Sequence, residues 1–132
     1  MAARGITIGL LWHSVNSPNL GLGALTLGHL AILDEIAAGL GIVPRYRVIG
    51  VKDPDPAYIL RPDLTARGLR TRDYVRPVNG LAGAIRACDL VCDIGGGDSF
   101  TDLYGADRFR RLWAAKALAI ALAPHGIRVN AI

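Results

Sequence analysis

Two short apolar runs, each followed directly by a glycine-rich loop, constrain the fold of this chain most strongly. Residues 5–12 (GITIGLLW) are mostly apolar and lead into a loop of turn-forming residues, 13–23. Residues 90–94 (LVCDI) have the same character and lead into the loop 95–101. Short apolar runs bounded by turn signals are typical of strands buried on both faces of a parallel sheet. The sequence therefore predicts such a sheet, with both loops at the carboxyl ends of its strands.

Helices and further strands are predicted to alternate with these two runs along the 132 residues. The expected helices span 24–38, 80–87 and 104–122, and the other expected strands span 45–51 and 127–132. Residues 53–77 open with Asp-Pro-Asp-Pro and are expected to form a loop with at most a short helix. The alternation predicts a single Rossmann-like α/β domain with about four parallel strands and helices on both faces.

The first expected helix carries a run of apolar side chains. We expect Leu27, Leu30, Ala31 and Ile32 to lie near the core, and Gly39 to cap the carboxyl end of the helix.

Composition and charge narrow the class of protein. With 52% hydrophobic residues the chain can build a core, and 15 Lys and Arg against 11 Asp and Glu give a net charge of +4. A basic excess suits anionic ligands, but the arginines are dispersed and no nucleic-acid recognition motif is present, so no nucleic-acid partner is expected. The apolar stretch 117–124 is far shorter than the roughly 20 residues of a membrane helix. We see no signal sequence, and we expect a cytoplasmic protein without membrane insertion.

The two cysteines are expected to pack in the protein interior and not to bind a metal. Cys88 and Cys92 have no metal-ligand spacing with histidines or further cysteines, so no metal site is expected. Free cysteines are among the most frequently buried residues, and we expect both to be buried.

The second glycine-rich loop contains the main candidate ligand-binding residues, Gly95, Gly96, Gly97, Asp98 and Ser99. Backbone amides in such a loop, ahead of a helix, can hold a phosphate or a carboxylate. The loop matches neither the Walker nor the dinucleotide-binding pattern. A tight turn in which Asp98 or Thr101 caps the following helix remains the alternative.

The first loop carries further candidates. Asn19 and Gly21 either contact a ligand or form an Asx turn that starts a helix. His13 ends the first strand and is a weaker candidate site residue, which could act as a general acid, a general base or a hydrogen-bond donor. Asp93 is expected to be buried and paired with amides of the glycine loop. Asp102 and Asp107 are expected to support the start of the last helix.

The stretches SPNLGLGALTL (17–27) and DIGGGDSFTDLYG (93–105) resemble the polysaccharide pyruvyl transferase family, and the likeness extends over residues 5–122. Gly23 stands where many members have an acidic residue. The resemblance implies two Rossmann-like domains facing across a cleft, as in GT-B glycosyltransferases, with this chain as the N-terminal half.

The reaction implied by this resemblance moves a pyruvyl group from phosphoenolpyruvate to a hydroxyl of a sugar or polysaccharide acceptor, in polysaccharide biosynthesis, and needs no cofactor. Asn19, Gly21 and the 95–99 loop would contact ligand through backbone amides. The family's phosphoenolpyruvate-binding and acid-catalytic residues lie in the second domain. We therefore assign no catalytic residue and expect this chain to be inactive by itself.

Two alternatives from other functional classes stay open. Residues 122–132 resemble the short-chain dehydrogenases, which would make Tyr104 an acid in an NAD(P)-dependent oxidoreductase. Arg108 then stands where that family has lysine, and the cofactor-binding loop of that family is missing. The other alternative is a non-catalytic module that self-associates through exposed apolar surface as a homo-oligomer.

Overall fold

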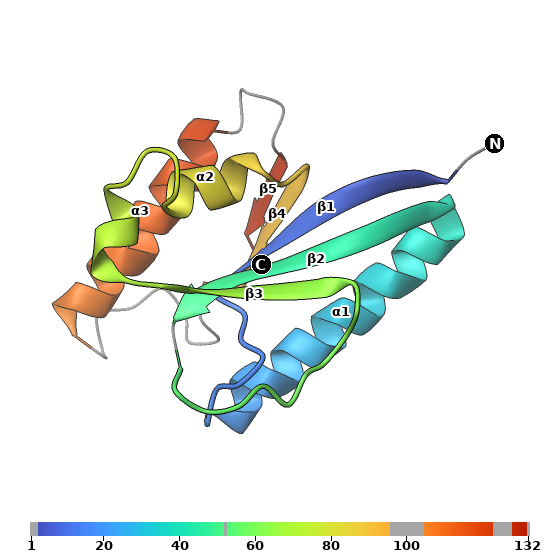
Figure 1. The fold of residues 1–132 in the computed structure, drawn as a ribbon, viewed down its shortest axis with the longest axis horizontal. Helices are drawn as coiled ribbons and strands as arrows, with labels where there is room; N and C mark the ends of the chain where they lie inside the picture. The colour runs from blue at the N-terminus through green and yellow to red at the C-terminus, as the bar shows by residue number, and fades with distance from the viewer. Residues whose placement is uncertain (1–2, 52, 96–104, 123–127, 132) are drawn as a thin grey trace.

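In the part of the chain that the structure describes, the fold is a five-stranded, all-parallel sheet with helices on both faces (Figure 1). The computed structural model describes residues 3–51, 53–95, 105–122 and 128–131. The strands are β1 (Arg4–Leu11), β2 (Ile42–Val51), β3 (Leu64–Leu69), β4 (Leu90–Asp93) and β5 (Arg128–Ala131). The helices are α1 (Leu20–Leu40), α2 (Leu81–Arg86) and α3 (Ala106–Leu122), with a 3₁₀ turn at Thr71–Tyr74.

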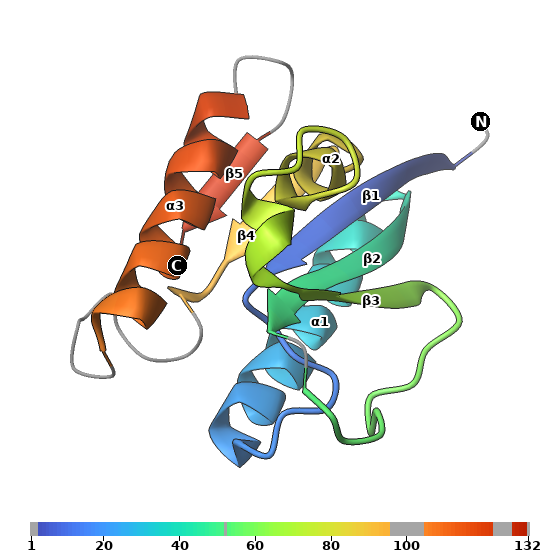
Figure 2. The same cartoon turned by 60° about the vertical axis from the view of Figure 1, so that its left-hand side comes forward.

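The sheet separates two hydrophobic clusters. Helix α1 lies on one face, and α2 and α3 lie on the other (Figure 2). Leu10 and Val48 belong to the cluster under α1, whereas Leu11 and Ile49 belong to the cluster under α2 and α3. Neighbouring residues of one strand thus enter opposite clusters, as the alternation of side chains along a strand requires. The predicted α/β class with a parallel sheet is confirmed.

The strand order is β3-β2-β1-β4-β5, and the direction in which successive strands are added to the sheet changes between β1 and β4. From β1 the chain builds outward through β2 to β3, and it then returns to add β4 and β5 on the other side. The carboxyl ends of β1 and β4 therefore lie side by side, and the helices that follow them, α1 and α3, lie on opposite faces of the sheet (Figure 2). Such a switch point is where open α/β sheets bind ligands.

The expectation of a loop over 53–77 is wrong, because β3 lies within it. Leu64–Leu69 pairs with β2 in parallel, with Tyr46 opposite Leu64 and Gly50 opposite Gly68. The segment LTARGL has neither a continuous apolar run nor strict alternation, because β3 is an edge strand with mostly accessible side chains. It also makes the sheet five-stranded instead of four-stranded.

Helix α1 is longer than predicted at both ends. It begins at Leu20 after the cap Asn19 and ends at Leu40, where Gly41 adopts a left-handed conformation with φ of 64°. Gly41 therefore takes the capping role predicted for Gly39, since glycine adopts positive φ without a steric penalty.

The buried side of α1 also differs from the prediction. Of the four apolar residues expected near the core only Leu30 is buried, and its buried companions are Gly23, Thr26 and Ala37. Small side chains on this side let α1 lie close to the sheet. The larger residues Leu27 and Ile32 are left exposed.

An ion-pair network ties α1 to the chain around β3. Arg61 donates to Asp34 at 2.7 and 3.0 Å and to Asp63 at 2.9 and 2.6 Å. The Tyr46 hydroxyl donates to Asp34 at 2.8 Å, and the Arg61 guanidinium lies 5.1 Å from the centre of the Tyr46 ring. Hydrogen bonds from Arg61 hold the pKa values of Asp34 and Asp63 below their usual range.

Candidate functional site

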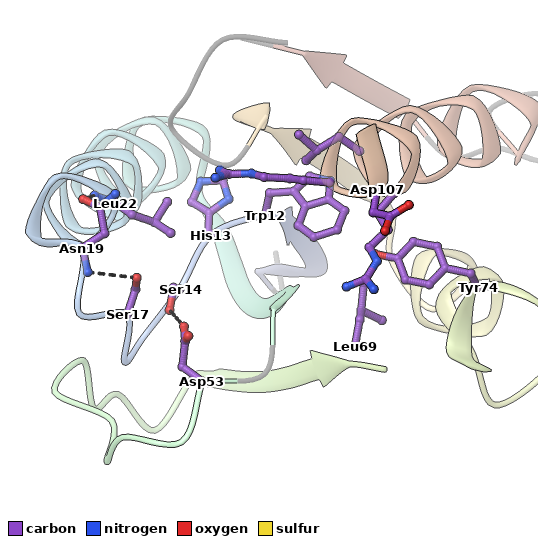
Figure 3. Close-up of a pocket in the computed structure, with 13 residues that line it drawn as sticks. Trp12, His13, Ser14, Ser17, Asn19, Leu22, Asp53, Leu69, Tyr74 and Asp107 are labelled. Carbon is purple, nitrogen blue, oxygen red and sulfur yellow. Dashed lines mark hydrogen bonds between the residues drawn. The ribbon is translucent and has the colours of Figure 1, made fainter. Parts of the chain in front are cut away.

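The switch point carries a cavity of about 430 Å³ between the end of β1, the start of α1 and the start of α3 (Figure 3). Its lining combines an apolar part with polar and cationic groups. The lining residues are Trp12, His13, Ser14, Ser17, Asn19, Leu22, Asp53, Leu69, Tyr74, Asp107, Arg108, Arg111 and Leu112. A concave, partly apolar space with a few convergent polar groups is the usual form of a small-molecule site.

Trp12 forms the middle of the cavity lining, between His13 and Tyr74 (Figure 3). Its backbone has a φ of 64°, which bulky residues rarely adopt. The amide of Trp12 donates to Ile49 O at 2.7 Å, and this bond helps hold the strained residue at the end of β1. The buried indole Nε1 has no hydrogen-bond partner among the residues that the structure describes. Strain of this kind concentrates at functional sites, where the surrounding structure enforces it.

His13 is buried and is hydrogen-bonded through both ring nitrogens. Its Nδ1 lies 3.1 Å from Leu11 O, and its Nε2 lies 2.8 Å from His29 Nδ1. A carbonyl oxygen can only accept, so Nδ1 of His13 carries the proton and Nε2 accepts from the Nδ1–H of His29. The rings of His13 and His29 are also stacked, with centroids 5.0 Å apart.

This arrangement keeps His13 neutral. Burial, reinforced by the neighbouring His29, lowers the pKa of His13 to about 4. Burial also lowers the pKa of His29. A neutral imidazole with both nitrogens engaged is suited to holding the loop in position more than to donating a proton to a ligand.

The loop that follows β1 is fixed by its own polar side chains. The amide of Ser14 donates to Thr26 Oγ1 at 3.2 Å, and the Ser14 hydroxyl donates to Asp53 at 3.3 Å. Asn16 Nδ2 donates to the backbone oxygens of Asp53 and Asp55 at 3.1 and 2.8 Å. The loop is therefore joined both to α1 and to the segment after β2.

Asn19 lines the cavity and caps α1. Its Oδ1 accepts from the amides of Gly21 at 3.0 Å and Leu22 at 3.3 Å. The predicted Asx-type capping turn is confirmed. The Gly21 amide is thereby engaged within the protein. Ligand contact by Asn19 and Gly21 stays a prediction.

The end of β4 is held by Asp93. Its carboxylate accepts from the Gly95 amide at 2.7 Å, as predicted, and pairs with Lys116 of α3 at 3.5 Å. Gly95 has a φ of 62°, which suits glycine at this turn. Gly96, Gly97, Asp98 and Ser99 lie outside the described residues, as do Thr101, Asp102 and Tyr104.

The α3 side of the cavity carries the cations. Arg108 and Arg111 line it from the first two turns of the helix. Asp107 lies in the first turn, as predicted, and pairs with Arg110 at 3.5 Å on the surface. Burial raises the pKa of Tyr74 to about 12, and the nearby Arg111 opposes that rise. Tyr74 is therefore a protonated donor close to a guanidinium.

The sequence alone did not identify Trp12, Tyr74 or Arg111 as site residues. In the sequence, Trp12 is only the last apolar residue of a predicted strand. Tyr74 was not identified because it follows the edge strand β3, which was not predicted. Arg111 belongs to an arginine cluster near the start of α3, and only its position opposite Tyr74 shows that it borders the cavity.

The described side chains include no cluster of three or more His, Cys, Asp or Glu that could hold a metal ion. Cys88 and Cys92 are buried and unpaired, as predicted, and burial raises the pKa of the Cys88 thiol to about 11. Comparisons with protein-family models, curated proteins and solved structures give no match.

Proposed function

We propose that this chain is a pyruvyl transferase-like domain, whose switch-point cavity binds a substrate of pyruvyl transfer from phosphoenolpyruvate to a sugar hydroxyl. The observation that carries the proposal is the position and lining of the cavity. It lies at the carboxyl end of β1, where the first glycine-rich loop of the family resemblance leaves the sheet, and β4, which precedes the second such loop, is the neighbouring strand. In the proposed two-domain arrangement this cavity would face the second domain.

The chemistry of the lining supports an anionic, hydroxylated ligand. Arg111 supplies positive charge on the α3 side, and guanidinium groups bind carboxylates and phosphates well. The two acidic lining residues already have partners, since Asp53 accepts from Ser14 and Asp107 pairs with Arg110. Phosphoenolpyruvate carries both a phosphate and a carboxylate, and the proposal gives Arg111 of this domain a contact with it in addition to those that the resemblance implies for the second domain. Ser17 on the other side of the cavity offers a hydroxyl suited to a sugar.

Trp12 provides a direct test, because it lines the cavity and the chain has only one other tryptophan, Trp113. In a Trp113→Phe background, phosphoenolpyruvate should change the fluorescence of Trp12 in a saturable manner. Adding Arg111→Met should weaken binding by roughly tenfold or more, the usual effect of losing a charge-assisted hydrogen bond. Arg86→Met is the matched control, because Arg86 is exposed, does not line the cavity and donates to Pro77 O, outside the lining.

The dehydrogenase alternative gives a different result in the same experiment. It requires saturable binding of NADPH, without a requirement for phosphoenolpyruvate. Equal loss of binding in the Arg86 and Arg111 variants would place the ligand outside the cavity and contradict the proposal.

A further inference from the structure

The switch-point cavity has two chemically different ends (Figure 3). Polar side chains from the loop after β1, such as those of Ser17 and Asn19, line one end. Leu69 and Tyr74 lie at the other end, with Trp12 between the two (Figure 3). We call this second end the Tyr74 end, and its lining residues are Trp12, Leu69, Tyr74, Arg111 and Leu112.

The wall of the Tyr74 end is apolar and firmly held. Trp12, Leu69 and Leu112 are 5, 8 and 4% exposed, and they belong to the hydrophobic cluster under α2 and α3, against which Tyr74 packs. The strained backbone of Trp12 is fixed by the bond from its amide to Ile49 O. A ligand group that enters this end therefore meets apolar atoms, and polar bonds made beside such a wall are strengthened by the low local dielectric.

Two hydrogen-bond donors at the Tyr74 end have no partner. Among the residues that the structure describes, neither the Tyr74 hydroxyl nor the Arg111 guanidinium makes a hydrogen bond or an ion pair. The two groups are close enough to interact, because the charge of Arg111 opposes the rise in the pKa of Tyr74 that burial causes. The Tyr74 hydroxyl stays protonated at neutral pH, so both groups can donate to one acceptor between them.

The remaining charged groups on the α3 side of the cavity are already engaged. Arg108 interacts with another group of the protein, and Asp107 pairs with Arg110 at 3.5 Å. Among the described lining residues of this side, the charge of Arg111 is therefore the one available to a ligand. One guanidinium and one hydroxyl match a carboxylate, which has a single negative charge and two acceptor oxygens. A phosphate dianion has a second charge and a third terminal oxygen to satisfy.

We propose that the Tyr74 end is a carboxylate subsite, in which Tyr74 and Arg111 donate to the oxygens of a small organic acid whose apolar part lies against Trp12. The inference rests on the proposed function, since it assigns the carboxylate of phosphoenolpyruvate to one end of the same cavity. The phosphate of that ligand then lies towards the rest of the cavity. Tyr74 is thereby a specificity-determining residue, which favours a carboxylate beside a small apolar group over inorganic phosphate.

Two simple probes separate the carboxylate from the phosphate. Pyruvate has the carboxylate and the small carbon skeleton, whereas inorganic phosphate has neither. In the Trp113→Phe background, pyruvate should change the fluorescence of Trp12 in a saturable manner and should compete with phosphoenolpyruvate. Inorganic phosphate should bind roughly tenfold more weakly or worse, because it lacks the apolar contact with Trp12. Phosphate binding as tight as that of pyruvate would overturn the inference.

Tyr74→Phe tests the hydroxyl directly, since it keeps the ring in the hydrophobic cluster. It should weaken pyruvate binding by roughly tenfold, the usual effect of losing a hydrogen bond to a charged group. Tyr46→Phe is the matched control, because it removes a tyrosine hydroxyl that donates to Asp34, and Tyr46 does not line the cavity. Equal affinities of Tyr74→Phe and Tyr46→Phe for pyruvate would refute a role for the Tyr74 hydroxyl.

Combining Tyr74→Phe with Arg111→Met shows whether the two residues hold one group. If both donate to the same carboxylate, each substitution should cost less affinity in the presence of the other, whereas fully additive losses would place them on different groups and contradict the inference. Phosphoenolpyruvate binding that depends on Arg111 but not on Tyr74 would support the proposed function and overturn the carboxylate subsite. Pyruvate binding that depends on both residues, without binding of phosphoenolpyruvate, would do the reverse.

Discussion

His13 Nε2 lies 2.8 Å from His29 Nδ1, and this contact joins the end of β1 to α1 across the floor of the switch point. The bond from His13 Nδ1 to Leu11 O fixes which nitrogen of each ring carries the proton. The pair therefore holds the loop after β1 as a neutral hydrogen-bonded unit, and the stability of the site should depend on pH through it.

Stability should fall as pH decreases from about 6.5 to about 4. The pKa of His13 is lowered from 6.5 to about 4 by burial, so the unfolded chain binds a proton in this window and the folded chain does not. The contribution is complete above the unfolded pKa and amounts to up to about 3 kcal/mol. Urea unfolding at a series of pH values should show this slope, and His13→Gln should flatten it. A slope unchanged by His13→Gln would assign the pH dependence to other groups.

Removing the carboxylate that closes β4 should destabilise the fold. Asp93→Ala removes the buried carboxylate that accepts from the Gly95 amide and pairs with Lys116, which should cost about 2–3 kcal/mol. Asp93→Asn keeps an acceptor oxygen for Gly95 and should cost less. Chemical denaturation of both variants measures the difference. Equal stability of Asp93→Ala and the wild type would show that the buried pair contributes nothing net.

Two glycine substitutions should have opposite effects. A Cβ on Gly50 would lie 2.5 Å from His13 O, so Gly50→Ala must displace the loop that forms the cavity floor. We expect a loss of about 1–3 kcal/mol, as for overpacked sites. Gly39→Ala meets nothing within 4 Å and should stabilise α1 by roughly 0.5–1 kcal/mol. Thermal unfolding distinguishes the two, and a stabilising Gly50→Ala would contradict the close approach of the backbones.

Arg61→Lys should destabilise the protein by about 1 kcal/mol. Lysine cannot reproduce the forked contacts of Arg61 with Asp34 and Asp63. The loss of unfolding free energy stays small because these side chains are partly exposed, and exposed ion pairs contribute little to stability. Arg110→Lys is the control, because its pair with Asp107 is almost fully exposed and should contribute nothing measurable. Denaturation midpoints at low and high salt measure both variants. An equal effect of the two would show that the network around Arg61 is no stronger than a surface pair.

The parts of the fold that the sequence predicted are those with a local signal. The run 5–12 is buried from residue 8 onward and the run 90–94 is buried at 91–93, and side chains of both strands enter the two clusters, so their apolar composition identifies them as strands. The cap of α1 was predictable because Asn19 contacts amides only two and three residues away. Strand β3 was not predicted, because the side chains of an edge strand can stay mostly accessible and the sequence then shows no apolar strand pattern.

Relationships across the sequence were not predictable. The side of α1 that faces the sheet was mistaken because Gly23, Thr26 and Ala37 carry little hydrophobic signal, while the exposed leucines and isoleucines carry a strong one. Tyr74 of the 3₁₀ turn and Arg111 of α3 border the same cavity although they are far apart in the sequence. No sequence pattern predicts that these two residues come together at one cavity.

A thermal melt with and without ligand tests the central claim most directly, that the switch-point cavity binds a substrate of pyruvyl transfer. A ligand that binds only the folded state raises the melting temperature by mass action. Millimolar phosphoenolpyruvate should raise the melting temperature of the wild type and of Arg86→Met, but not that of Arg111→Met. A cooperative melt that shifts with NADPH alone, or with neither ligand, would contradict the claim.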